Sequence, residues 1–225
     1  MGMRERKAQR SRDRIIAEAM TLFAGSGYEQ TTMETIAEAA DISPSTLYRY
    51  FASKDTIVLA SFTANTAKFA EVFAMRVQDL PIDRALAEAI FAVLAVEDED
   101  PKRALLVRSI LGQSPGARAK LWDYLGDQQR ELAKQLAQCL HVADDDPVVL
   151  LTARIALDVL LTAADIWRAG KGTASSRGTA INLMKLLQGG TVMLPDPGPE
   201  LAIEPAKTEI KSLARKTGVA SRSSG

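Results

Sequence analysis

Four of the nine prolines in this sequence directly follow a serine or an aspartate, a pairing that marks the start of a helix. The serine or aspartate side chain accepts hydrogen bonds from the free backbone amides of the first helical turn. Proline suits the next position because the N–H group that it lacks would have no partner inside the helix. The pairs are Ser43-Pro44, Asp100-Pro101, Ser114-Pro115 and Asp146-Pro147. Pro81, followed by Asp83, predicts a fifth helix start.

The rest of the pattern also favours helices. No stretch sustains an alternation of apolar and polar residues, and no Asn-Gly or Asp-Gly pair joins two apolar runs, so strands and hairpins are not predicted. Apolar residues instead recur at helical spacing. We therefore expect an all-α fold of about nine helices. Their predicted spans are 10–25, 33–40, 44–51, 54–78, 82–97, 101–113, 115–140, 147–170 and 174–189.

The composition bounds the class of protein. Hydrophobic residues make up 47% of the 225 residues, enough for a substantial core, and 28 basic residues balance 28 acidic ones. The single cysteine, Cys139, excludes an internal disulfide framework and fits a reducing cytoplasm. The charged N-terminus lacks an apolar signal core, so we expect no export signal and a cytoplasmic protein. The apolar run 147–167 contains Arg154, Asp158 and Asp165, which predicts a buried helix and no membrane span.

The stretch from Gly27 to Lys54 predicts two short helices joined by a three-residue turn. Thr31 or Thr32 caps the first helix, and Thr31 has the capping-box spacing to Glu34. The turn is 41–43, and its aspartate tolerates the left-handed backbone conformation that such a turn often needs. Two short helices joined in this way form the frame of a DNA-reading helix-turn-helix.

The second helix of this pair has a composition suited to DNA. Leu47 and Phe51, spaced i and i+4, are expected to face the core, which turns the other side chains outward. The outward side chains offer hydroxyl groups and one cation, and none is acidic and repels phosphate. They are Ser45, Thr46, Tyr48, Arg49 and Tyr50. The N-terminal residues of such a helix lie at the base edges of the major groove.

Two basic features agree with this interpretation. Residues 1–14 carry six basic and two acidic side chains, an excess that can neutralise phosphates or enter the minor groove. A charged, solvated terminus explains the same excess equally well. Ser53 caps a further helix at Lys54, where a cation opposes the helix dipole unless an anion such as phosphate is near.

Several short motifs follow one another in a fixed order. They are Leu22-Phe23, Gly27-Tyr28, Thr31-Thr32, Ile36-Ala37, Ser43, Thr46-Leu47-Tyr48, Tyr50-Phe51 and Ser53-Lys54-Asp55. In order and spacing, over roughly residues 10–60, they resemble the N-terminal pattern of the TetR family of transcription regulators. Asp41 and Ser45 stand where the family usually has glycine, and Ser45 leaves the operator sequence open. From Met75 onward the resemblance extends only to length and helicity.

The resemblance implies a two-domain regulator. Residues 9–69 would form a three-helix DNA-binding domain, with the helix-turn-helix at about 32–51, and 70–192 a helical ligand-binding and dimerisation domain. A homodimer would repress transcription at a palindromic double-stranded DNA operator and be released by a small-molecule effector, without cofactor, metal or membrane. Beyond these domains, proline, glycine, serine and charged residues dominate, so 193–225 is predicted to be a disordered tail.

The resemblance also assigns roles to single residues. The positions that match those holding DNA phosphates are Thr32, Tyr48 and Lys54. The positions that match those approaching or reading bases are Pro44, Ser45, Thr46, Arg49 and Tyr50. The capping residues Thr31 and Ser43 complete the predicted DNA-binding set.

The second domain carries two further predictions. The helix at 147–170 is apolar almost all round, so we expect a second subunit to cover one side, with 174–189 completing a two-fold four-helix bundle. The effector pocket is expected to take an apolar or amphipathic ligand. Its predicted lining is Phe69, Phe73, Phe91, Arg108, Trp122 and Leu157. Arg108 either anchors an acidic group of the ligand or is a surface arginine whose stem packs on the core.

An enzyme and a helical adaptor are the alternative classes of function. The sequence contains no phosphate loop, nucleophile elbow or zinc motif. One cysteine and one histidine, Cys139 and His141, leave neither the usual nucleophile–base pairs nor a zinc site. An adaptor would not require the Thr-Leu-Tyr motif, the Ser-Lys cap and the basic N-terminus together. We therefore expect neither catalytic residues nor an enzyme.

Overall fold

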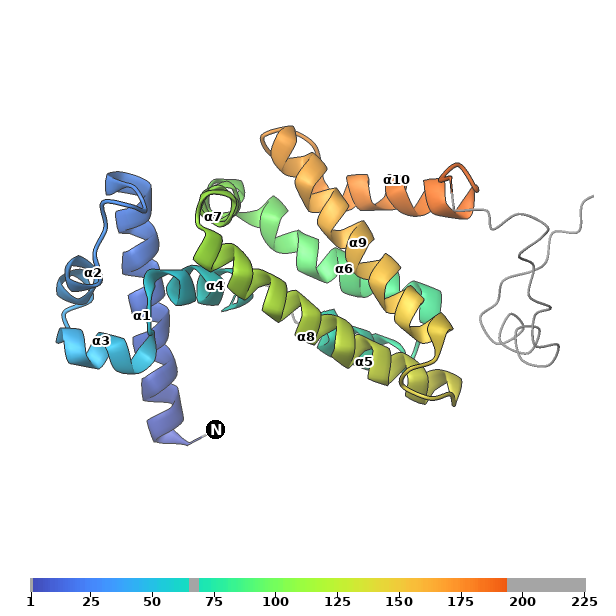
Figure 1. Ribbon diagram of the computed structural model, residues 1–225, viewed down its shortest axis with the longest axis horizontal. Helices are drawn as coiled ribbons and strands as arrows, with labels where there is room; N and C mark the ends of the chain where they lie inside the picture. Colours follow the sequence, from blue (N-terminus) through green and yellow to red (C-terminus); the bar gives the residue numbers. More distant parts are fainter. Residues whose placement is uncertain (1, 65–68, 194–225) are drawn as a thin grey trace, which may run out of the picture.

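The computed structural model describes residues 2–64 and 69–193, and within these ranges it contains helices, turns and loops but no strand. Ten helices follow one another along the described chain (Figure 1). Their bounds are α1 (Met3–Ser26), α2 (Met33–Ala39), α3 (Pro44–Tyr50), α4 (Lys54–Ala64), α5 (Phe69–Arg76), α6 (Ile82–Glu99), α7 (Pro101–Gln113), α8 (Pro115–Leu140), α9 (Pro147–Ala169) and α10 (Ser176–Gln188). The arrangement confirms the predicted all-α class. The tail expected to be disordered lies, from residue 194 onward, outside the described residues.

Side-chain caps begin four helices at the predicted Ser-Pro and Asp-Pro pairs. In each pair the side-chain oxygen accepts a hydrogen bond from a backbone amide of the first turn, and proline is among the first helical residues. The bonds run from the amides of Thr46, Arg103, Ala117 and Val148 to Ser43, Asp100, Ser114 and Asp146, at 3.2, 3.2, 3.2 and 2.8 Å. The predicted spans of α7 and α8 coincide with those in the structure because their caps are coded locally.

The first helix is longer than predicted. It begins at Met3, where the Glu5 carboxylate accepts a hydrogen bond from the Gly2 amide at 2.7 Å. Gln9 and Asp13, one turn apart, are joined by a bond of 2.8 Å. The basic stretch of the sequence is therefore the first half of α1 and not an extended arm. The helix ends at Gly27, whose φ of 88° lies in a region that favours glycine.

The segment 54–78, predicted as a single helix, is described in two parts. The structure has two helices, α4 and α5, and residues 65–68 between them lie outside the described residues. Ile57 and Val58 of α4 pack in one core, whereas Phe69 and Phe73 of α5 pack in another. Periodicity does not reveal this division, because the segment contains neither proline nor glycine and is rich in apolar residues throughout.

Two hydrophobic cores stabilise the described chain. The first lies among α1–α4, and it also contains Val107, Ile110 and Leu111 of α7 and Ala117 of α8. The second lies among α5, α6, α8, α9 and α10. Since α7 packs mainly in the first core while its chain neighbours α6 and α8 reach into the second, it connects the two parts of the molecule.

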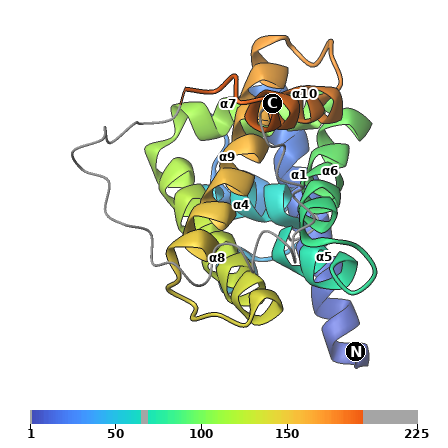
Figure 2. The ribbon, with the colours of Figure 1, turned by 90° about the vertical axis from the view of Figure 1, so that its right-hand side faces the viewer.

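The two ends of the molecule are formed by different helices. Helices α1–α3 gather at one end and α10 lies at the other (Figure 1). Figure 2 looks onto this second end, where α10 packs on α6 and α9.

Helix α9 is long and apolar enough to cross a membrane by length and composition alone, but the core helix of a soluble protein passes the same test. Nine of its residues are buried within the fold.

Candidate DNA-binding surface and effector pocket

Helix α2 begins with a capping box built from two threonines. The Thr32 hydroxyl accepts a hydrogen bond from the Thr35 amide at 3.1 Å, and the Thr35 hydroxyl accepts one from the Thr32 amide at 2.9 Å. The predicted box of Thr31 with Glu34 is therefore wrong by one position. Thr31 is only 3% exposed, and its hydroxyl donates to the Gly27 carbonyl at 2.8 Å. Its side chain supports the entry into α2 and does not reach the surface.

The turn between α2 and α3 has the predicted conformation. Asp41 adopts the left-handed region with φ of 53°, and the Ile42 amide donates to the Ala37 carbonyl at 3.0 Å. Ser43 then caps α3. Leu47 and Phe51 are fully or almost fully buried, as their spacing predicted. The local sequence thus fixes which face of α3 is turned away from the core.

The outward face of α3 is polar and open. Ser43, Pro44, Ser45, Tyr48 and Arg49 are exposed. Thr46 and Tyr50 are half-buried. The Ser43 hydroxyl contacts the hydroxyls of Ser45 and Thr46 at 3.0 and 2.9 Å, so three small hydroxyls cluster at the N-terminus of the helix. Tyr48 is 49% exposed, and the Arg49 guanidinium lies 5.8 Å from the centre of the Tyr50 ring.

The basic half of α1 lies against the end of α3. The Arg12 guanidinium donates to the Tyr50 carbonyl at 3.2 Å and sits 4.5 Å from the centre of the Phe51 ring. Arg14 lies 3.9 Å from Asp41 in the turn. Arg4, Lys7 and Arg10 are exposed on the same half-helix. The basic excess of residues 1–14 is visible in the sequence, but its contacts with α3 and the turn depend on the fold.

Lys54 has protein partners in the structure. Its ammonium donates to the carbonyls of Tyr28 and Glu29 at 2.7 and 3.4 Å, and it lies 4.5 Å from the centre of the Tyr28 ring. These contacts offset the unfavourable position of a cation at a helix N-terminus. The fold therefore does not require a phosphate beside Lys54, although the sequence suggested one.

Asp55, in the first turn of α4, connects the DNA-binding end to α8. Its Oδ1 atom accepts hydrogen bonds from the Tyr28 hydroxyl at 2.5 Å and from the Ser114 hydroxyl at 2.8 Å. Burial and the bond to Asp55 raise the pKa of the Tyr28 hydroxyl well above its ordinary value. A Cβ atom at Gly116 would meet this carboxylate, 3.1 Å from its Cγ. Tyr28 and Asp55 stand in recognisable motifs, but no sequence spacing indicates Ser114 as their partner.

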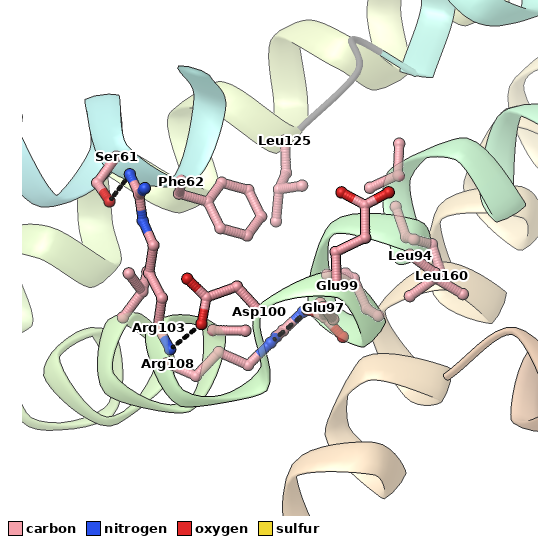
Figure 3. A pocket seen from close by; sticks show the side chains of 14 residues that line it. Ser61, Phe62, Leu94, Glu97, Glu99, Asp100, Arg103, Arg108, Leu125 and Leu160 are labelled. Carbon is pink, nitrogen blue, oxygen red and sulfur yellow. Dashed lines mark hydrogen bonds and ion pairs between the residues drawn. The ribbon is translucent and has the colours of Figure 1, made fainter. Parts of the chain in front are cut away.

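A cavity of about 310 Å³ lies where α4, α6, α7, α8 and α9 meet (Figure 3). Phe62, Leu94, Leu125 and Leu160 supply apolar walls. Glu97 and Arg108 meet on one side, and Phe62 and Leu125 lie across the cavity from them (Figure 3). The Arg103 guanidinium donates to the Ser61 hydroxyl of α4 at 3.1 Å. The volume lies at the lower end of the range typical of small-molecule sites.

Of the residues predicted to line the pocket, the structure places only Arg108 in this cavity. Phe69 and Phe73 of α5 are buried in the second core. The Phe91 ring is covered by Arg177, whose guanidinium lies 4.4 Å from its centre. The two remaining residues, Trp122 and Leu157, line a different hollow between α8 and α9.

Glu97 and Arg108 form a buried ion pair. The side chains are 9% and 12% exposed, and Glu97 Oε1 accepts hydrogen bonds from Nε of Arg108 at 2.9 Å and from Nη2. Burial raises the pKa of the Glu97 carboxyl, and the charge and hydrogen bonds of Arg108 oppose that rise. Arg108 therefore lines the cavity with its charge already matched. Glu97 was not foreseen, since a single glutamate near a helix end carries no signal in sequence.

One face of α9 and α10 leaves apolar side chains uncovered. They are Val148, Leu151, Ile155 and Ile166 of α9 and Leu186 of α10, each between 39% and 59% exposed. A groove between the two helices continues this face, lined by Ile155, Val159 and Leu183 among others. Contiguous apolar surface of this kind marks an interaction site on a soluble protein.

Known proteins resemble this chain in sequence. Residues 15–61 match the family described as bacterial regulatory proteins, tetR family. Over 151 residues the chain is 32% identical to the HTH-type transcriptional regulator TcmR of Streptomyces glaucescens, covering 64% of this chain and 67% of that protein. At 151 residues, this match is much longer than the family match over 15–61.

Two solved structures have the same fold. The TetR-family repressor FadR of Thermus thermophilus, in complex with lauroyl-CoA, has a TM-score of 0.59 at 23% identity, over 84% of this chain and 98% of its own. NalD, the secondary repressor of the MexAB-OprM multidrug efflux pump in Pseudomonas aeruginosa, has a TM-score of 0.59 at 16% identity, over 82% and 97%. The family match over 15–61 and the 32% identity to TcmR, together with the capped α2–turn–α3 unit, establish that the chain belongs to the TetR family of DNA-binding transcription regulators, which are not enzymes.

Proposed function

We propose that this protein is a cytoplasmic repressor that binds a palindromic operator as a homodimer and leaves it when a small molecule occupies the cavity. The observation that carries the proposal is the exposed, acid-free face of α3, held outward by its cap and by buried Leu47 and Phe51. The repressor sense is supported by FadR and NalD, two repressors that share this fold.

On DNA, α3 enters the major groove with its N-terminal hydroxyl cluster first. The residues proposed to approach bases are Pro44, Ser45, Thr46, Arg49 and Tyr50. Thr32 and Tyr48 hold phosphates from either side, and Arg12 and the exposed cations of α1 add charge along the backbone. Lys54 also contributes, because an ammonium has three donors and the carbonyls of Tyr28 and Glu29 occupy two.

The homodimer forms through α9 and α10. A two-fold axis would bring this uncovered apolar face against its own copy, as the symmetry of a palindromic site requires. Helices α9 and α10 lie in the part of the molecule away from α1–α3, so pairing through them leaves both DNA-reading helices free (Figure 1). Their half-sites are expected about one helical turn of DNA apart, ~34–36 Å, or a multiple of it.

Effector release acts through α4. The cavity touches Ser61 and Phe62 at one part of this helix, and Asp55 at its start is bonded to Tyr28 of the DNA-binding end. A ligand that prefers one position of α4 shifts the population of the DNA-competent dimer, and only its differential affinity for the two states drives the shift. FadR, which shares the fold, was solved with lauroyl-CoA.

Selection of chromosomal fragments by the purified protein, followed by gel shift, tests the proposal. We expect a palindromic fragment, a protein dimer by sedimentation, and loss of at least ten-fold in affinity for the Tyr48→Ala/Arg49→Ala variant. Lys134→Ala is the matched control, because Lys134 is an exposed cation near the far end of α8. Equal affinities of the α3 variant and this control would refute the DNA-binding role of α3.

A further inference from the structure

The carboxylate of Glu97 has an unused acceptor. The side chain is 9% exposed and belongs to the lining of the cavity. Its Oε1 atom is taken by Arg108, whereas Oε2 is buried and has no hydrogen-bond partner among the described residues. Buried polar atoms are almost always paired in native structures, and an exception calls for a group that completes it.

The cost of this arrangement is electrostatic. A buried carboxylate oxygen without a donor forfeits the hydration that it has in water. Arg108 neutralises the charge of Glu97 but approaches only one of its oxygens. The terminal torsion of a glutamate side chain is soft. A donor that enters the cavity can therefore capture the second oxygen without separating Glu97 from Arg108.

The other charges of the cavity favour a donor over an acid. Glu99 and Asp100 join Glu97 in the lining, against Arg103 and Arg108. Both arginines are engaged: Arg103 donates to Ser61, and Arg108 binds Glu97 and lies 3.9 Å from Asp165. An acidic ligand would have to break the Glu97–Arg108 pair and would face three carboxylates. This reverses the expectation, made from sequence, that Arg108 anchors an acid.

We infer that the effector is an apolar molecule bearing a hydroxyl or ammonium donor, which Glu97 receives while Phe62, Leu94, Leu125 and Leu160 enclose the apolar body. The inference rests on the proposed function of the cavity as the effector site. It commits Glu97 to a specificity role and leaves Arg108 as the positioning residue that holds the carboxylate.

Four probes with one shared ring system test this by calorimetry on the full chain without DNA. Naphthol and naphthylmethylammonium carry a donor, whereas methylnaphthalene carries none and naphthoate carries an acid. We expect the two donor probes to bind about ten-fold or more tightly than the other two. Tighter binding of naphthoate or of lauroyl-CoA than of the donor probes, or no advantage of the donor probes over methylnaphthalene, would overturn the inference.

Three variants locate the selectivity. Glu97→Met/Arg108→Met removes the pair together, so no buried charge is left alone, and keeps similar volumes. It should bind all four probes within about three-fold of one another. Glu97→Gln keeps the shape, but Arg108 takes its one oxygen and its other end becomes an N–H donor, so the variant should lose the preference for both donor probes. Glu88→Gln, which changes an acid of the same helix α6 that does not line the cavity, is the control and should retain both preferences.

The result separates this inference from the proposed function. A donor preference that survives in the Glu97→Met/Arg108→Met variant, or disappears in Glu88→Gln, places the selectivity elsewhere and refutes the role of Glu97. Operator binding by gel shift is measured independently in each variant. A failure of the probes to discriminate therefore leaves the DNA-binding proposal standing, whereas absence of operator binding contradicts the proposed function whatever the probes do.

Discussion

The DNA-facing surface of α3 and the cavity beneath α7 are built in opposite ways. The surface comes from one short segment, its side chains are exposed, and its frame is held by bonds between residues a few positions apart. The cavity draws residues from five helices and contains a buried ion pair. The same residue type illustrates the contrast, since Arg49 is exposed whereas Arg108 is 12% exposed and paired.

Because of this difference, substitutions on the outward face of α3 can change DNA binding without changing stability. Substitutions in the cavity change both ligand binding and stability. Side chains on the outward face of α3 make few contacts within the protein, so they can change with the operator at little cost to folding. In the cavity, every change of charge or volume alters the packing of several helices. A new effector specificity therefore requires compensating substitutions, and a new operator specificity does not.

Arg108→Ala should have the largest effect. It leaves Glu97 buried without its counter-charge, and breaking a buried pair in this way costs about 3–5 kcal/mol. Urea unfolding followed by circular dichroism measures the loss. In the Glu97→Met/Arg108→Met variant we expect stability close to that of the parent chain, because neither charge remains. Equal destabilisation of the two variants would show that packing, and not the unpaired charge, dominates at this site.

Leu47→Ala should be next in size. Leu47 is fully buried beneath α3, and removing a buried leucine side chain costs about 2–5 kcal/mol because a cavity remains. The same unfolding measurement applies, and operator affinity should fall as α3 loses its support. If Leu47→Ala weakened DNA binding while leaving the unfolding free energy unchanged, Leu47 would be acting at the interface and not in the core.

Arg49→Ala should change the unfolding free energy by less than about 0.5 kcal/mol, because the side chain is exposed. If Arg49 reads a base, the variant should lose about 1–3 kcal/mol of discrimination at one operator position. Gel shifts with singly substituted operators identify that position. A uniform loss of affinity over all substituted operators would instead assign Arg49 to a phosphate.

The contrast also explains what the sequence could and could not predict. The boundaries of α3, α7 and α8 are coded by adjacent capping residues, so spacing alone located them. The facing of Leu47 followed from its i, i+4 relation to Phe51. Glu97 and Arg108 come from different helices, and only the packing of α6 on α7 brings them together. The division of 54–78 likewise depends on which core each half enters.

The junction between the two regions should give the smallest effect and the most informative one. Gly116→Ala places a methyl group against the Asp55 carboxylate, which must shift away from the Ser114 and Tyr28 hydroxyls. Gly126→Ala, in the same helix, is the control, since the new methyl group would meet only the flexible end of Arg130 at 3.4 Å. Alanine in place of a helical glycine stabilises by about 0.5–1 kcal/mol, so Gly126→Ala should raise stability and Gly116→Ala should gain less.

Because Asp55 joins Tyr28 of the DNA-binding end to the cap of α8, its displacement should weaken the coupling between effector and operator. A change of about 1 kcal/mol in coupling shifts the effector concentration for half-release about five-fold. Gel shifts titrated with effector measure this for both variants, at operator concentrations where each still binds. We expect the half-release concentration to shift in Gly116→Ala but not in Gly126→Ala. If Gly126→Ala shifted the half-release concentration equally, the coupling would run through α8 as a whole, and the carboxylate of Asp55 would serve only to hold the fold together.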